Sequence, residues 1–100
     1  MSDQSGAGDG GAGSAASQLP AIDFSTFVLS LSTTALYQMG LIADSETQEM
    51  ISPNREIAQQ TIDTIEMMQA KTRANLEPEE AKLIDSLLYE LRLHFVELDA

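Results

Sequence analysis

The sequence predicts an all-α protein of three helices, at about residues 24–39, 54–74 and 79–98. Two observations lead to this prediction. Apolar residues recur at steps of three and four in each segment, which is the period of a helix that buries one side. A capping residue or a proline also stands at the start of each segment, where helices commonly begin. The last two helices are expected to form an antiparallel hairpin, and two copies of the chain a dimeric helical bundle.

Residues 1–20 are expected to form a disordered tail rich in Gly, Ser and Ala, followed by a single helical domain at residues 21–100. After Met1, the segment up to Ser17 holds no apolar residue larger than alanine, so it cannot bury enough surface to offset the entropy lost on ordering. Its glycines do not predict a phosphate-binding loop, because the Lys-Ser or Lys-Thr pair of such loops does not follow them.

The first helix lies in the stretch Phe24–Ala43, which contains no charged residue although the chain is acidic. Asp23 is its expected N-cap, and Gly40 is expected to end it in a left-handed conformation. Because a surface helix normally carries charges on its outer side, we expect this helix to be buried on most of its circumference. Its Ser and Thr hydroxyl groups are expected to bond to backbone carbonyls one turn back.

The second helix is expected to start near Ser52 and Pro53, with Asn54 as a competing N-cap, and to end at Asn75 in a left-handed C-cap. The third helix is expected to begin at Pro78, behind Glu77, which is an indifferent cap. Only residues 75–77 separate the two helices, and a link that short predicts the antiparallel hairpin.

The acidic composition limits the partners of the chain. A formal net charge of −11 argues against a nucleic-acid partner, which requires a basic surface, and against anionic membranes. The chain has no cysteine, so it can hold no disulfide, thiolate nucleophile or Cys-type zinc site. No secretory signal is recognisable at the N-terminus, and a cytoplasmic location is therefore expected.

No arrangement of residues points to catalysis, so we expect the protein not to be an enzyme and to need no cofactor. The metal candidates are Glu90, His94 and Glu97, which share one side of a helix at i, i+4 and i+7. His94 is the only histidine, and charges on such a side of a helix are usually solvated. A Ser-His-Asp triad would need the same histidine, and no serine has the glycines of a nucleophile elbow around it.

Three blocks carry a resemblance to a known family: DFSTFVLSLSTTAL at residues 23–36, QTIDTIEMMQAKT at 60–72 and NLEPEEAKLIDSLLYELRLHFVE at 75–97. In this order they resemble the bacterial family called domain of unknown function 1844 (DUF1844). The resemblance implies a bacterial, all-helical, cytoplasmic protein, and it brings no catalytic residues with it. The family pattern has Thr before the proline of the third helix, where this chain has Glu77, a difference that affects only the helix cap.

The leading functional hypothesis is a non-enzymatic protein–protein interaction module that forms a homodimer. Domains below about 70–80 residues rarely bury enough core to be stable alone, and oligomerisation is a usual remedy when no disulfide or metal is present. A further protein partner is left open. The interface candidates are apolar residues of the first helix and of a second strip on the third helix: Phe24, Phe27, Val28, Leu31, Leu36, Tyr89, Leu93 and Val96.

Two alternatives come from other classes of protein. The first is a metal-binding or small-ligand-binding bundle that uses Glu90, His94 and Glu97 across a dimer axis. The second is membrane association through Phe24–Ala43, a stretch that just reaches the length of a span. Six Ser and Thr residues in that stretch, and the absence of Lys or Arg before Arg55, argue against the membrane.

Overall fold

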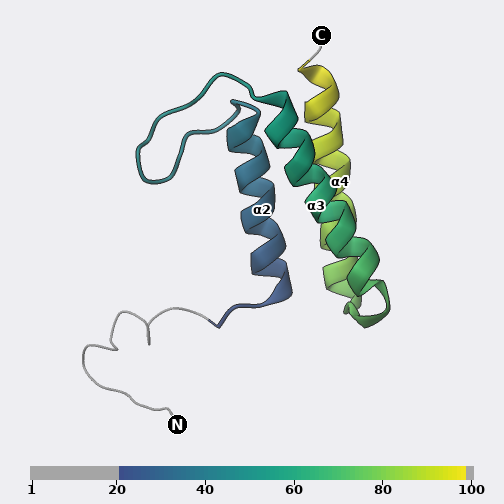
Figure 1. The fold of residues 1–100 in the computed structure, drawn as a ribbon. Helices are drawn as coiled ribbons and strands as arrows, with labels where there is room; N and C mark the ends of the chain where they lie inside the picture. Colours follow the sequence, from purple (N-terminus) through teal and green to yellow (C-terminus); the bar gives the residue numbers. More distant parts are fainter. Residues whose placement is uncertain (1–20, 99–100) are drawn as a thin grey trace, which may run out of the picture.

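A computed structural model describes residues 21–98 of the chain, and the predicted tail lies outside these residues. The described part contains three α-helices, α2 (Phe24–Gln38), α3 (Arg55–Thr72) and α4 (Pro78–Glu97), and the 3-10 turn η1 (Arg73–Asn75) (Figure 1). None of residues 21–98 lies in a strand. The prediction of an all-α fold with three helices is therefore confirmed, with helix ends that differ by one or two residues.

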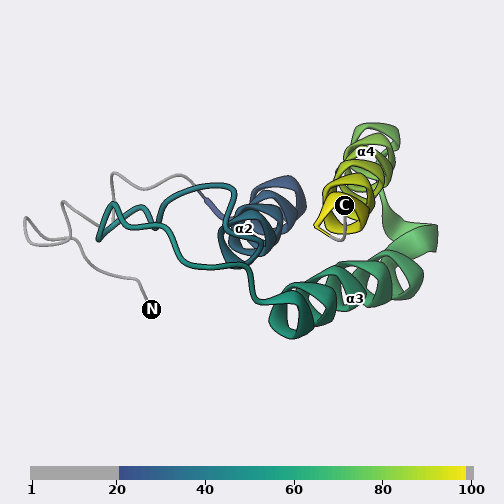
Figure 2. The ribbon, with the colours of Figure 1, turned by 90° about the horizontal axis from the view of Figure 1, so that it is seen from above.

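The helices enclose one apolar core, because each of the three contacts the other two. Viewed from above, α2, α3 and α4 stand at the corners of a triangle (Figure 2). Each helix contributes residues spaced by three or four to the space between them, as the periodicity predicted. The buried apolar residues are Val28, Ala35, Met39, Ala58, Ile62, Ile65, Ile84, Leu88 and Leu91.

Both ends of α2 follow the predicted capping signals. The backbone N–H of Thr26 donates to Oδ1 of Asp23 at 2.7 Å, which makes Asp23 the N-cap. At the other end Gly40 has a φ of 75°, and the N–H of Leu41 donates to the carbonyl of Leu36 at 3.0 Å. This bond across a left-handed glycine is the Schellman motif, and it satisfies a carbonyl that the helix leaves free.

The burial expected for α2 is wrong for the single chain. Only one stripe of the helix, Val28, Ser32 and Ala35, is buried, followed by Met39 at the C-cap. Because α3 and α4 lie on the same side of α2, they cover this stripe and leave the opposite side exposed (Figure 2). The uncharged side of α2 thus faces outward.

The start and end of α3 differ from the prediction. Asn54 is the N-cap, since its Oδ1 accepts from the N–H of Ile57 at 3.2 Å, and Pro53 lies before the helix. Asn75 does not adopt the predicted left-handed conformation. Among the non-glycine residues of 21–98, only Gln48 has a positive φ. The last turn tightens into η1 instead, and Leu76 then packs against the core.

The cap of α4 depends on a residue inside the helix. The carboxylate of Glu80 accepts from the backbone N–H of Glu77 at 2.8 Å, and the side chain of Glu77 accepts from the backbone N–H of Glu80, so that the two residues form a capping box. The Glu77 carboxylate therefore takes the place that the hydroxyl group of a Thr or Ser occupies in a capping box. This capping box compensates for the indifferent cap that the sequence predicted.

Two aspartates, the N-cap of α2 and a residue of the loop after α2, are expected to have lowered pKa values. The pKa of Asp23 is lowered by the N–H of Thr26, and the pKa of Asp44 by the N–H groups of Thr47 and Glu46. Because each folded-state pKa lies below the unfolded one, both carboxylates stabilise the fold above the unfolded pKa, and this contribution is lost as pH falls through the folded pKa. NMR titration of the carboxyl carbons should give both groups a pKa below the ordinary aspartate value.

The variant Asp23→Asn serves as the control for this titration. Asparagine is also a good N-cap but does not titrate in this range, so the variant is expected to fold normally and to lose part of the acid sensitivity. An ordinary pKa at both aspartates would contradict the hydrogen bonds described for them.

Candidate functional site

The exposed side of α2 is a surface without charged residues. We call it the α2 outer face, and its members are all exposed: Thr26, Phe27, Leu29, Ser30, Thr33 and Thr34. Four hydroxylic side chains form its middle, and the rings and methyl groups of Phe27 and Leu29 lie beside them. No charged residue occurs between Asp23 and Asp44, so the whole face is neutral at every physiological pH.

Three of the four hydroxyl groups of this face donate to backbone carbonyls of their own helix. Ser30 Oγ donates to the carbonyl of Phe27 at 2.7 Å, Thr33 Oγ1 to that of Leu29 at 3.0 Å and Thr34 Oγ1 to that of Ser30 at 3.0 Å. Burying a hydroxyl group is costly mainly when its hydrogen bond is lost, and these donors keep theirs without water. The α2 outer face is therefore suited to close contact with another apolar surface.

A second exposed apolar surface lies on α4. Tyr89, Leu93 and Val96 follow one another at i, i+4 and i+7 and are exposed by 68%, 47% and 65%. We call these three residues the α4 strip. They lie on the side of α4 away from Ile84, Leu88 and Leu91, which form the core side of the same helix.

The structure separates the predicted interface residues into two groups. Phe27, Tyr89, Leu93 and Val96 are exposed and remain candidates, whereas Phe24, Leu31 and Leu36 are partly buried against the core. Val28 is completely buried within the chain, so it cannot contact a partner, and its prediction as an interface residue is wrong for this fold. Leu29 was not among the predicted interface residues, although its place beside the Ser and Thr residues of α2 was a usable signal.

The predicted metal candidates are only partly brought together. His94 Nδ1 lies 3.5 Å from Oε1 of Glu97, an i,i+3 contact that becomes an ion pair when the histidine is protonated. Within residues 21–98, no three His, Cys, Asp or Glu side chains are grouped as a metal site requires. Glu90 is exposed and has no part in the His94 contact.

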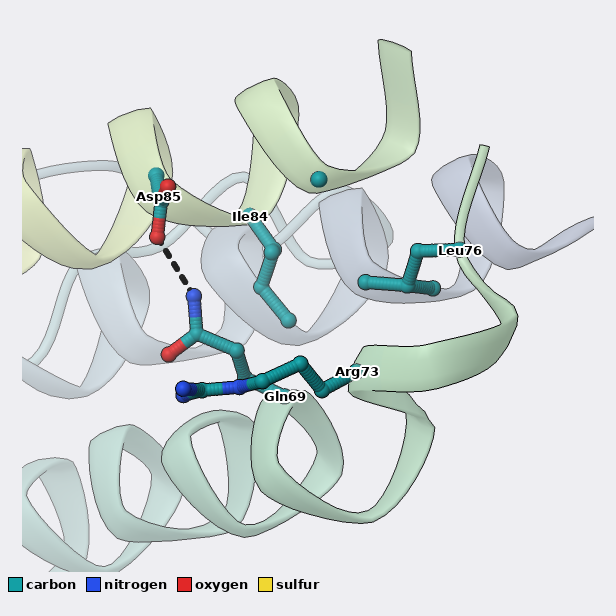
Figure 3. A pocket seen from close by; sticks show the side chains of 6 residues that line it. Gln69, Arg73, Leu76, Ile84 and Asp85 are labelled. Atoms are coloured by element: carbon teal, nitrogen blue, oxygen red, sulfur yellow. Dashed lines mark hydrogen bonds between the residues drawn. The ribbon is translucent and has the colours of Figure 1, made fainter. Parts of the chain in front are cut away.

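A hollow of about 320 Å³ lies where α3 passes through η1 into α4 (Figure 3). Its lining residues are Gln69, Arg73, Leu76, Ala81, Ile84 and Asp85. Gln69 Nε2 donates to Asp85 Oδ1 at 2.5 Å, and Figure 3 shows this bond crossing between the two helices. The hydrogen bond between Gln69 and Asp85 thus joins α3 to α4 at this hollow.

Comparison with known proteins identifies one family. A family model described as domain of unknown function (DUF1844) matches residues 21–97, a span that contains α2, α3 and α4. No curated protein and no solved structure matches the chain significantly. None of the helices in residues 21–98 has both the length and the hydropathy that crossing a membrane requires. The match confirms the resemblance found in the three sequence blocks.

Proposed function

The chain belongs to the DUF1844 family, and from the surface of α2 we propose that it is a non-enzymatic helical interaction module that forms a homodimer. One observation supports the proposal: the α2 outer face is exposed and uncharged, and three of its four hydroxyl groups already donate to backbone carbonyls. A net charge of −11 makes two copies of the chain repel each other. The electrostatic repulsion between two copies is therefore smallest when they associate through a face that carries no charge. The resemblance to a bacterial family supports a bacterial, cytoplasmic setting for this module.

In the proposed dimer, the α2 outer face of one copy lies against the same face of the other, as in any two-fold interface. The small Ser and Thr side chains allow the two helix axes to approach to about 8 Å. A helix of 15 residues is about 22 Å long, and such a contact alone buries less than the roughly 800 Å² per partner of a standard interface. We therefore propose that Phe27 and Leu29 extend the contact to both sides of α2.

Within each copy we propose that α3 and α4 form an antiparallel hairpin that supports α2 from its core side. Three contacts support this register: Gln69 with Asp85, Glu66 with Arg92, and the Arg55 guanidinium at 4.6 Å from the centre of the Phe95 ring. As the residue number falls along α3, that of its contact on α4 rises. Two such hairpins and two α2 helices would make up the dimeric bundle.

The variant Ser30→Glu tests the proposed dimer. It places a carboxylate in the middle of the α2 outer face, where it would be buried without a partner in both copies. We expect the parent chain to be a dimer at micromolar concentration and the variant to dissociate with a constant raised at least about tenfold. Light scattering over a dilution series measures both masses, and circular dichroism shows whether the variant keeps its helices.

Gln60→Glu is the matched control, because it adds the same charge at an exposed position of α3. It is expected to leave the dissociation constant of the dimer nearly unchanged. The proposal fails if the parent chain is a monomer at all concentrations, or if Ser30→Glu and Gln60→Glu weaken the dimer equally.

A further inference from the structure

The α4 strip is a second surface that the proposed dimer does not use. From Tyr89 to Val96 it extends over two turns, about 10 Å along the helix. Its three side chains lie on the side of α4 opposite the core, so neither α2 nor α3 covers them. An apolar row at helical spacing is what the apolar side of another helix requires for docking.

The charges beside the strip are predominantly negative. Glu90 and Glu97 are exposed next to it, and no guanidinium or ammonium group contacts either one within residues 21–98. Arg92, also adjacent, forms an ion pair with Glu66 of α3, so its charge is already compensated. With a net charge of −11 over the chain, the field at the strip attracts cations.

We propose that the α4 strip binds a basic amphipathic helix of another protein. The apolar side of that helix covers Tyr89, Leu93 and Val96, and its Lys or Arg side chains pair with Glu90 and Glu97. A second copy of this chain fits the strip poorly, because the same glutamates of both copies would meet. Three side chains also bury much less than the roughly 800 Å² per partner of a stable interface, so the complex is transient, with a dissociation constant of roughly micromolar order.

The tyrosine content of the chain provides a direct measurement. The chain has no tryptophan and two tyrosines, so in a Tyr37→Phe background Tyr89 is the sole source of tyrosine emission. The probe is a synthetic peptide of about five helical turns, with Leu on one side, Lys on the other and no aromatic residue. We expect it to change the Tyr89 emission in a saturable way, and the same peptide with Glu in place of Lys to have no effect.

Two variants separate docking on the strip from general attraction to an acidic protein. Leu93→Gln removes the central apolar side chain of the strip without changing the charge, and it should weaken peptide binding at least tenfold. Met67→Gln removes an exposed apolar side chain of α3 in the same way and should have no effect. Ser30→Glu should also bind the peptide normally, so that failure of the proposed dimer is distinguished from failure of this surface.

Three results would overturn the proposal. The first is the absence of saturable binding. The second is equal binding to Leu93→Gln and Met67→Gln, which means that only the net charge attracts the peptide. The third is loss of the dimer in Leu93→Gln, which assigns the strip to contact between copies of this chain.

Discussion

Leu91→Ala is expected to lower the free energy of unfolding by about 2–5 kcal/mol, the largest effect of any single truncation considered for this chain. Leu91 is 1% exposed and belongs to the core between the three helices. Its replacement removes apolar contacts and leaves a cavity that the neighbouring helices cannot close completely. Small domains have roughly 5 kcal/mol of stability in total, so the variant should retain at most about 3 kcal/mol, and a loss at the upper end of the range would leave about half of its molecules unfolded. Urea unfolding followed by far-ultraviolet circular dichroism measures this loss.

Leu93→Ala is the control for that experiment, because it makes the same change two residues further along the same helix. Leu93 is 47% exposed, and its truncation is expected to cost less than about 1 kcal/mol. Both variants should be compared at one protein concentration, since the apparent stability of a dimer depends on concentration. Equal losses in the two variants would contradict the assignment of Leu91 to the core and Leu93 to the surface.

The helix ends show how far local chemistry determines this fold. Asp23 and Gly40 were predicted correctly because each needs only neighbouring residues: a carboxylate facing free N–H groups and a residue that tolerates positive φ. The start of α3 could not be predicted from neighbouring residues alone. Two local signals compete at this point: Ser52 followed by Pro53, and Asn54. Asn54 is selected by a long-range bond in which its N–H donates to the carbonyl of Gln38 at 2.8 Å. No local pattern contains that bond.

The candidate surfaces, too, were predictable where they depend on one helix and unpredictable where they depend on packing between helices. The sequence indicated that α2 is uncharged and that Tyr89, Leu93 and Val96 form a separate strip, because both are properties of spacing along one helix. It did not show which of the adjacent apolar residues of α2 point inward. Val28 is buried and Leu29 is exposed because of where α3 and α4 lie, and that depends on packing between helices. Likewise, no spacing rule predicts that Arg92 pairs with Glu66 of another helix.

Gly40→Ala is the second substitution for which we expect a large effect, a loss of about 2–4 kcal/mol in the free energy of unfolding. Gly40 has a φ of 75°, which an L-residue with a Cβ atom adopts at a cost of roughly 1–2 kcal/mol. The added Cβ would also lie 2.8 Å from the carbonyl oxygen of Ile51 and 3.2 Å from Cδ of Pro53. Thermal and urea unfolding of the purified variant measure the loss.

Gly40→Asn separates the two causes of that loss, because asparagine tolerates positive φ better than alanine but carries the same Cβ atom. If the backbone conformation dominates, the asparagine variant should recover part of the stability. If the contact with Ile51 and Pro53 dominates, both variants should be equally unstable. A Gly40→Ala variant as stable as the parent would contradict the turn itself. Since Gln38 and Asn54 join the end of α2 to the start of α3 beside this glycine, a shift there moves α2 relative to α3. The α2 outer face would move with it, so Gly40→Ala should also weaken the proposed dimer without touching its surface.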